Sequence, residues 1–497
     1  MAEHFPALIV VGPLLAALLI AAAGWFNRKA CFPMAVLTLL WVLLMCIGLA
    51  LRVVESGSIE YRLGGWAPPL GIAYHIDFLN GIVLVVVALV AFLNLLASWH
   101  SIEQEMADKA GAFYGLYVLF TTGLLGMVVT GDAFNLFVLL EIASLTAYAL
   151  IGMGDGRSAL SGLHYVFMGT IGASFYLLGV GYIYLVTGTL NMADIAARLP
   201  ALYSSGTVLL AFVLCMTGLF VKMALFPLHM WLPNAYANAP SFSASLIAPL
   251  TTKVMIYVMI RIGLSVFSPS FTFELSGLAP AMVWMAVIAI VAGSVMALFQ
   301  KRLKRMLAYI VVAEVGYMVG GFWLGNRAAV AGAILHIVND AMMTLCVFLA
   351  AGLIVHRLRT DALADLKGLF RKMPFTMTAF VVGGLSLIGV PPLCGFFSKW
   401  YLLSGGIVAG HYGFVAALLF SSLINVVLFF RIIEIGYFEP LSGPHGHHHE
   451  PQTRMAEAPV GMLIPLWVTA GLLLVFGVYS GDIVTRIMQF AIPETVF

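Results

Sequence analysis

The sequence predicts an all-α integral membrane protein with about fourteen transmembrane helices. Hydrophobic residues make up 62% of the 497-residue chain and charged residues only 9%, whereas soluble domains carry about 25% charged residues. Apolar stretches of about 20 residues, long enough to cross a bilayer as a helix, recur from end to end. Short polar or glycine-rich segments join most of them, so we expect no soluble domain between the spans.

The expected spans follow one another along the chain. Each is a helix because a segment in hydrocarbon must pair its backbone polar groups internally. Their ranges are 5–25, 32–52, 79–98, 112–130, 134–153, 160–187, 205–228, 241–263, 279–299, 305–325, 328–355, 374–406, 412–433 and 460–481. Residues 53–78, with IEYRLGGWAPP, are typical of a short β-hairpin at the membrane surface.

The seventh and twelfth spans have prolines in their interiors. Residues 221–240 read VKMALFPLHMWLPNAYANAP, and residues 387–403 read LIGVPPLCGFFSKWYLL. Proline removes a backbone donor and breaks a helix, so helices 7 and 12 are predicted to be broken. Broken helices at corresponding places indicate internal repeats around an ion site.

These breaks divide the chain into four expected parts. Two inverted five-helix repeats stand between an N-terminal part and a C-terminal part. The ranges are 1–111 (spans 1–3 with the hairpin), 112–263 (spans 4–8), 279–433 (spans 9–13) and 460–497 (span 14 and the tail).

Lysine and arginine are divided unevenly between the two sets of loops. Of 24 such residues, fifteen follow odd-numbered spans, while six follow even-numbered spans or lie in the tail. Basic loops face the cytoplasm. Both termini are therefore expected on the extracytoplasmic side of a bacterial or archaeal inner membrane, as an even number of spans also requires.

Several ionisable side chains fall at membrane depth. An unpaired charge there costs about 2.5–3.5 kcal/mol on insertion scales, so these groups must pair, meet water or lose their charge. One such residue could simply fix helix register, but six indicate a proton or cation path. The six are Glu141, Lys222, Lys253, Glu314, Asp340 and Lys399, and His164 and His336 lie at similar depth.

Spacing suggests which of these side chains meet. Glu141 is the only charge in its span, so its partner must lie on another helix, and Lys222 is the natural candidate. His336, Asp340 and Thr344 are spaced four residues apart and share one face of the eleventh span. This polar stripe suits a proton path inside the bundle. An interhelical hydrogen bond is the alternative, above all for Thr344.

Four segments together resemble a known family. They are GLFVKMALFPLHMWLPNAYANAP, QKRLKRMLAY, HIVND and GVPPLCGFFSKW. They are similar to segments of the antiporter-like subunits of respiratory complex I and of Mrp-type multisubunit cation/proton antiporters. The resemblance covers nearly the whole chain. The length and the single block of spans look most like the D subunit of Mrp antiporters.

The resemblance implies a role for each matching residue. Glu141 matches a glutamate that pairs with the lysine of the seventh span, here Lys222, and Lys253 matches a linking base on the eighth span. His336 and Asp340 fall on the connecting face of the eleventh span, and Lys399 matches the charged residue of the second broken helix. In the family, protons are thought to move as these pairs switch.

The chain also departs from the family pattern. Thr344 stands where many relatives have a lysine on the eleventh span, and His164 stands where a lysine is common on the sixth. These departures leave open that the central proton path is interrupted at Thr344 and that the chain belongs to a divergent branch of the family.

The expected function is proton translocation in a multisubunit monovalent cation (Na⁺)/proton antiporter, so the chain would be a transporter subunit and not an enzyme. One alternative is a proton-pumping subunit of complex I or of a membrane-bound hydrogenase, which would make it part of a redox-driven translocase. The other is a non-conducting scaffold subunit. Expected partners are other membrane subunits, lipid, protons and Na⁺ or another monovalent cation.

Other features carry little functional information. The net charge of +2 gives no sign of a nucleic-acid partner, and no motif predicts a cofactor or a metal. His445 and His447–His449 form a tract that could bind metal, although a solvated loop is the simpler interpretation. The five cysteines are scattered in the sequence and are expected as packing residues, not as disulfides or metal ligands.

Overall fold

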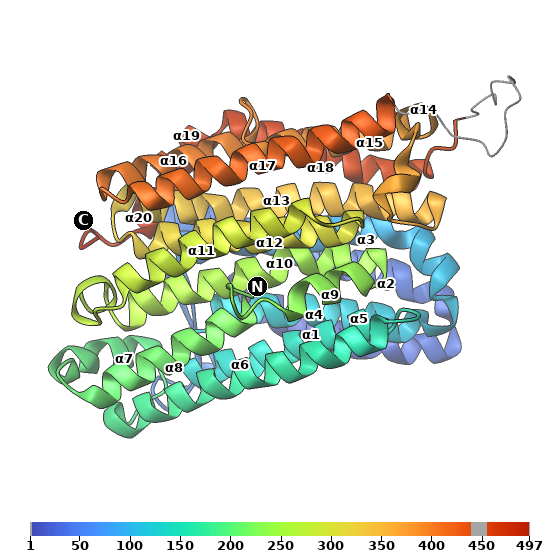
Figure 1. Ribbon diagram of the computed structural model, residues 1–497. Coiled ribbons are helices and arrows are strands. Elements are labelled where there is room, and N and C mark those ends of the chain that lie inside the picture. Colours follow the sequence, from blue (N-terminus) through green and yellow to red (C-terminus); the bar gives the residue numbers. More distant parts are fainter. Residues whose placement is uncertain (1, 439–454, 497) are drawn as a thin grey trace, which may run out of the picture.

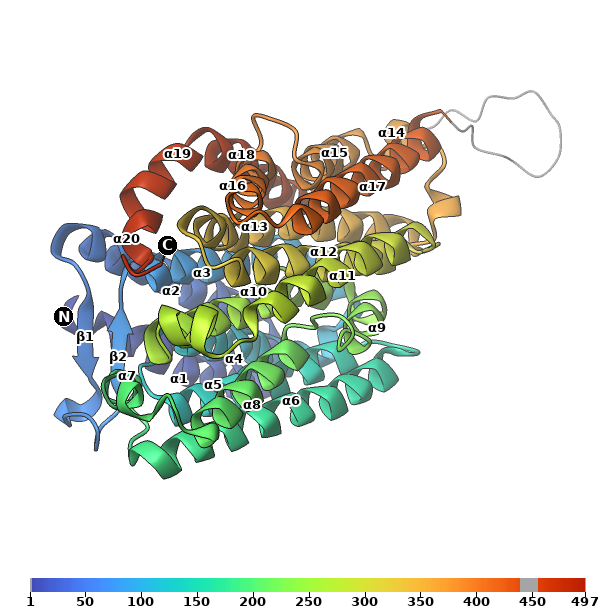
Figure 2. The ribbon, with the colours of Figure 1, turned by 60° about the vertical axis from the view of Figure 1, so that its left-hand side comes forward.

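The computed structural model describes residues 2–438 and 455–496. Its helices run roughly alongside one another in a single bundle, and a two-stranded sheet stands at one end (Figures 1 and 2). The histidine tract at 445–449 lies outside the described residues, so the interpretation of that loop stays a prediction.

The N-terminal part contains three long helices and the hairpin. These elements are α1 (Phe5–Phe26), α2 (Arg28–Ser56), β1 (Ile59–Arg62), β2 (Ala73–Ile76) and α3 (Phe78–Glu105). The first set of five crossings follows. Its crossings are α4 (Ala110–Val129), α5 (Ala133–Gly152), α6 (Ser158–Thr187), the broken pair α8 (Gly206–Lys222) and α9 (Trp231–Asn238), and α10 (Ser241–Arg261), and the short helix α7 (Met192–Arg198) lies between α6 and α8.

The second five-helix set is built in the same order. Its crossings are α11 (Ala279–Leu298), α12 (Leu303–Trp323), α13 (Arg327–Leu358), the broken pair α15 (Pro374–Ile388) and α16 (Cys394–Val408), and α17 (Tyr412–Tyr437). The short helix α14 (Leu369–Lys372) lies between α13 and α15. The chain then ends with α18 (Val460–Val478), α19 (Ser480–Ile483) and α20 (Gln489–Ala491).

The predicted number of crossings is accounted for by twelve unbroken helices and two broken ones. Within the described residues, twelve helices are long and apolar enough to cross a membrane. The seventh predicted span is divided into α8 and α9, and the twelfth into α15 and α16, at the prolines that the sequence singled out. The fold prediction is therefore confirmed.

Each break falls in the fourth crossing of its set of five. Because five is an odd number, the second set enters the membrane from the side opposite to the first, which makes the two sets inverted relative to each other. The exact unit boundaries at 112–263 and 279–433 stay a prediction. The short helix α7 was expected only as loop. The side chain of Asn191 caps it by accepting a hydrogen bond from the Asp194 amide at 3.1 Å.

The hairpin marks the end of the bundle at which both chain ends lie. β1 and β2 pair antiparallel, as predicted. His4 contacts Tyr61 of β1 through a 2.9 Å hydrogen bond, and Phe490 of α20 packs on Phe78 at a ring distance of 5.3 Å. The two termini thus lie on one side of the bundle, as an even number of crossings requires.

The centre of the bundle is formed by α10, α12 and α13. The most apolar windows of α10 and α12 are fully buried, and that of α13 is 94% buried, whereas that of α1 is only 28% buried. Polar side chains on the three central helices therefore meet other side chains and not lipid. All five cysteines are buried and unpaired, as expected for packing residues.

Candidate functional site

The first polar cluster forms where α8 ends. The Lys222 ammonium lies 3.2 Å from Oε1 of Glu141 on α5 and donates to the Ser144 hydroxyl at 2.7 Å. Because Lys222 is the last residue of α8, it also sits at the negative end of the helix dipole. The break exposes carbonyls, and one of them, Val221 O, accepts from the Trp231 indole at 3.0 Å.

The two members of this pair are buried to different extents. The Lys222 side chain is 2% exposed, whereas that of Glu141 is 26% exposed. Glu141 and the exposed His164 of α6 therefore reach the outer surface of this chain. A carboxylate cannot stay charged against lipid at little cost, so this surface needs a polar neighbour.

The second cluster joins α10 to α13 at the centre of the bundle. Nζ of Lys253 lies 2.8 Å from Oδ2 of Asp340, and both side chains are almost completely buried. Thr344 donates to Oδ1 of Asp340 at 2.8 Å and accepts from Lys253 at 3.4 Å. Thr344 therefore bridges the pair, where the sequence suggested that it could interrupt the path.

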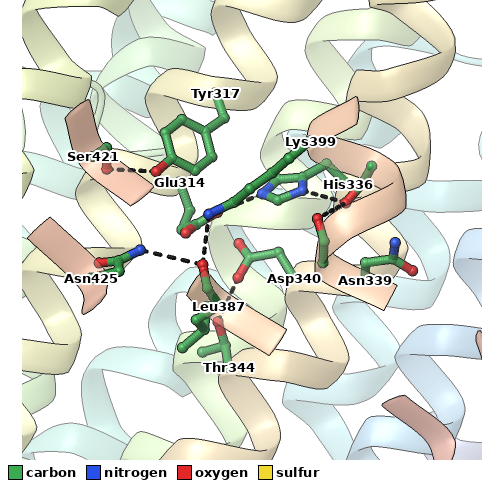
Figure 3. A network of polar contacts seen from close by, with 12 residues as sticks. Glu314, Tyr317, His336, Asn339, Asp340, Thr344, Leu387, Lys399, Ser421 and Asn425 are labelled. Carbon is green, nitrogen blue, oxygen red and sulfur yellow. Dashed lines mark hydrogen bonds and ion pairs between the residues drawn. The ribbon is translucent and has the colours of Figure 1, made fainter. Parts of the chain in front are cut away.

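The third cluster gathers around His336 (Figure 3). Its Nε2 atom lies 2.5 Å from Oε2 of Glu314 on α12, and its Nδ1 atom lies 2.8 Å from the Ser398 hydroxyl on α16. His336 and Glu314 are both completely buried.

Lys399 occupies the second broken helix, beside the same cluster. Its ammonium donates to Leu387 O at 2.6 Å and to the Ser422 hydroxyl at 3.3 Å. Leu387 lies in the last turn of α15, where the break leaves carbonyls without helical partners. Gly389 closes that helix with φ of 96°, a conformation that favours glycine. The break thus supplies the acceptor that holds Lys399.

All six predicted site residues take part in these clusters, but the clusters are not joined into one chain of contacts. Within the described residues, no hydrogen bond or ion pair connects Lys222 to Lys253. Buried polar atoms without a protein partner occur on the segment after Lys222 and on α10 beside Lys253. They are both ring nitrogens of His229, the Tyr236 hydroxyl and the hydroxyls of Thr251 and Thr252. Polar sites of this kind can hold bridging water.

Glu314 is the functional candidate that the set of predicted site residues lacked. The sequence had marked it as an acid at membrane depth, yet only the structure places it against His336. A signal was available in the sequence. Glu314 is the only acidic residue of α12, the second helix of the second set, just as Glu141 is the only acidic residue of α5, the second helix of the first set.

A polar cavity opens at the hairpin end of α10. It has a volume of about 460 Å³, and its lining includes His75, Asp77 and Arg261. Arg261 donates to both carboxylate oxygens of Asp77, at 2.6 and 2.8 Å, and to the Tyr257 hydroxyl at 3.1 Å. Burial disfavours the charged form of Asp77, but the Arg261 guanidinium outweighs it and holds the pKa of that carboxyl well below its usual range.

This cavity lies on the same face of α10 as Lys253. Lys253, Tyr257 and Arg261 are spaced four residues apart and follow one another along that face. The stripe leads from the centre of the bundle toward the hairpin end. Sequence reasoning missed it because only Lys253 lay deep enough to draw notice.

Glu314, His336 and Asp340 also have ligand types that metals use, and their candidate atoms lie within 4.8 Å of one another. Two ammonium groups act on the same carboxylates, however. Lys253 is 2.8 Å from Asp340, and Lys399 is close enough to interact electrostatically with Glu314 and Asp340. With its negative charge already balanced, the cluster suits proton exchange better than a divalent cation.

Residues 130–425, more than half of the chain, match the family described as NADH:quinone oxidoreductase/Mrp antiporter, TM. The chain belongs to this family. The resemblance that the broken helices and their lysines indicated is confirmed, and the chain is a multi-pass membrane protein of the NADH:quinone oxidoreductase/Mrp antiporter family.

Relatives of this family member come from both branches that the family description names. The chain is 41% identical to the N subunit of NADH-quinone oxidoreductase from Desulforudis audaxviator, and the match covers 99% of each chain. It is 31% identical to the D subunit of the Na(+)/H(+) antiporter from Alkalihalophilus pseudofirmus, over 90% of this chain and 89% of the relative.

A solved structure shows the same fold. A chain of the membrane-bound sulfane sulfur reductase, an archaeal respiratory membrane complex, superposes with a TM-score of 0.88 at 31% identity, over 97% of this chain and 96% of the other. The family member described here thus shares its architecture with a subunit of a large membrane complex.

Proposed function

We propose that this chain translocates protons as a membrane subunit of a multisubunit monovalent cation (Na⁺)/proton antiporter. The observation that carries the proposal is the row of buried ammonium groups, Lys222, Lys253 and Lys399, each held by a carboxylate or a helix-end carbonyl inside the bundle. Charges at this depth are costly and mark ion pathways. Relatives named as antiporter subunits support the assignment.

The proposed mechanism uses the pairs as switches. In the first pair, Lys222 holds a proton while Glu141 is close, at 3.2 Å, and releases it when that contact opens. In the centre, Asp340 does the same for Lys253 at 2.8 Å, and His336 passes protons on toward Lys399. No redox cofactor is required of this chain for such a relay, so we propose a transporter subunit without catalytic chemistry of its own.

The location and the partners follow from the surface. We propose a bacterial or archaeal inner membrane with both termini on the extracytoplasmic side, because most basic residues follow odd-numbered spans. The 26% exposed Glu141 points to a neighbouring membrane subunit that covers this face. Lipid would cover the many exposed apolar residues, such as Leu18 and Leu185.

The test uses the assembled complex in inverted membrane vesicles. Lys222→Ala and Glu141→Ala should each abolish cation-dependent proton movement, recorded with a pH-sensitive fluorescent dye. Thr469→Val is a matched control, because Thr469 is buried on α18 and, within the described part of the chain, hydrogen-bonds only to Pro465 O of its own helix. Unchanged transport in both lysine and glutamate variants would instead establish the non-conducting scaffold.

A second candidate function has one observation in its favour. The relative with 41% identity over the full length is named a subunit of NADH-quinone oxidoreductase, and the solved relative belongs to a respiratory complex. The same relay would then be driven by electron transfer in partner subunits. An imposed Na⁺ gradient would move protons in the antiporter, whereas a redox-driven complex would respond only when an electron donor is supplied.

A further inference from the structure

We propose that Glu314 is the proton-carrying carboxylate of the second five-helix set, exchanging a proton with His336 and delivering it to Lys399. This inference rests on the proposed function and adds a residue to it. Glu314 stands on the second helix of its set, where Glu141 stands in the first, and each is the only acidic residue of its helix. The two sets therefore share the position of a carboxylate, although their bases differ.

The hydrogen bonds of His336 allow it to share one movable proton with Glu314. In the proposed arrangement, the Ser398 hydroxyl donates to Gly395 O at 3.3 Å and accepts from Nδ1–H of His336 at 2.8 Å. With one hydrogen fixed on Nδ1, the contact between Nε2 and Oε2 of Glu314 holds the only other proton. That proton belongs either to an imidazolium facing a carboxylate or to a carboxylic acid facing a neutral imidazole.

The other oxygen of Glu314 is available for a second partner. Oε1 is buried and has no hydrogen-bond partner among the residues that the structure describes, although a buried unsatisfied acceptor costs about 1–3 kcal/mol. Lys399 lies beside Glu314 in Figure 3 and interacts electrostatically with it; its ammonium donates to a carbonyl and a hydroxyl and lies over the Tyr317 ring at 5.0 Å. Lys222 and Lys253 each have a carboxylate in direct contact, whereas Lys399 has none among the described residues.

Charge couples the two bases. Asp340 is already paired with Lys253 at 2.8 Å, so Glu314 is the carboxylate that remains for His336 and Lys399 to share. It can neutralise one of them at a time, and a proton on His336 therefore disfavours a proton on Lys399. Because His336 and Lys399 compete for Glu314, the cluster has two alternative protonation states and not one fixed ion pair.

The step balances without any further reactant. The N–H bond at Nε2 of the His336 imidazolium breaks as an O–H bond forms on Oε2, which leaves a neutral imidazole and a carboxylic acid. Rotation of that acid presents its hydrogen to Lys399. The O–H bond then breaks and an N–H bond forms on the neutral amine, giving a carboxylate and an ammonium group. No electrons are gained or lost.

The decisive variants are Glu314→Gln, which keeps the shape but cannot carry a proton, and Glu314→Asp, which keeps the acid. Thr469→Val is again the control, since it removes a buried 2.8 Å hydrogen bond to Pro465 O on α18, outside the three clusters. Proton transport per assembled complex in inverted vesicles should fall at least about tenfold in Glu314→Gln, recover in part in Glu314→Asp, and stay unchanged in the control.

A second readout separates proton carriage from a structural role. Infrared difference spectra of the reconstituted complex after a pH jump should contain a carboxylic-acid C=O band that Glu314→Gln removes and Glu314→Asp shifts. If Glu314→Gln lowers transport only in proportion to the amount of complex, and the band persists, Glu314 is structural and the proposal is wrong. If transport survives Glu314→Gln but not Lys222→Ala, this proposal fails while the proposed function stands. If it survives both, the proposed function fails too.

Discussion

Replacing Asp340 with Asn tests whether the centre of the bundle depends on a coupled buried ion pair. The substitution removes a carboxylate that is completely buried and leaves the Lys253 ammonium, 2% exposed, without its counter-charge at 2.8 Å. The asparagine amide oxygen, the Thr344 hydroxyl and Ala248 O, the last two at 3.4 Å, could still accept from Lys253, but none of them carries a negative charge. Lys253→Met is the complementary change and leaves Asp340 buried with a hydrogen bond from Thr344 but no cation in direct contact.

The magnitude follows from the geometry of the pair. At 2.8 Å and an effective dielectric constant of about 20, the Coulomb attraction is about 6 kcal/mol. Desolvating the two ions offsets most of it, so the intact pair adds little net stability. Removing one partner keeps the desolvation cost of the other, and each single variant should lose about 3–5 kcal/mol. The double variant lacks both charges and should lose clearly less than the sum, with a coupling energy of at least about 2 kcal/mol.

The wild type, the two single variants and the double variant form a double-mutant cycle. Equilibrium unfolding of each purified complex in mixed detergent micelles, followed by fluorescence, measures its unfolding free energy. Proton transport in vesicles is recorded in parallel and should be lost in the single and double variants alike. Recovered stability without recovered transport would separate the two roles of the pair. The reasoning is refuted if Asp340→Asn costs under about 1 kcal/mol and the double variant equals the sum of the singles.

Three further predictions concern the remaining charges. Glu141→Gln should destabilise the complex by more than Lys222→Met, because the ammonium left behind is enclosed in this chain at 2% exposure, whereas the carboxylate left behind is 26% exposed on this chain and still faces the proposed neighbouring subunit; a reversed order in thermal unfolding would contradict this. Lys399→Met should abolish transport and lower the unfolding free energy by about 1.5–3 kcal/mol, because it removes the charge-assisted hydrogen bonds to Leu387 O and the Ser422 hydroxyl. Asp77→Asn should cost about 1.5–3 kcal/mol by removing the bidentate contact with Arg261. Because the pKa of Asp77 is depressed in the folded protein, its contribution to stability is fully present at pH values above the ordinary Asp pKa of about 4 and is lost in stronger acid. The penalty of Asp77→Asn should therefore be constant from about pH 5 to 8 and shrink only at lower pH, which a pH series of unfolding curves would show.

The crossings could be predicted from the sequence because each depends on its own segment alone. A run of apolar residues of sufficient length becomes a spanning helix whatever its neighbours are. The breaks were equally local, since Pro227 and Pro391 act on the helix that contains them. Even the first ion pair could be inferred, because Glu141 had no other charge in its span and Lys222 was the nearest unexplained cation.

The second half of the site depended on packing that the sequence does not encode locally. Periodicity placed His336 on one face of its helix but could not say that Glu314 and Ser398 would meet it from two other helices. The departure from the family pattern left open that Thr344 interrupts the path, whereas the hydroxyl donates to Asp340 and accepts from Lys253. Which faces of which helices adjoin is fixed by the register between helices, a property of the whole bundle.

The three lysines and three acids explain how a charged row can lie in the bundle and still conduct. Glu141, Glu314 and Asp340 carry three negative charges that the ammonium groups of the three clusters can balance, and His336 adds the one base in excess. An unpaired charge at this depth costs about 2.5–3.5 kcal/mol. A proton that enters the row leaves one positive charge without a carboxylate partner and raises the energy by about that amount, whichever cluster holds the surplus charge. Passing the surplus to the next pair then changes the energy little, because each cluster has a carboxylate that can pair with a protonated base. The barrier lies in opening a contact such as the 2.8 Å pair of Lys253 and Asp340.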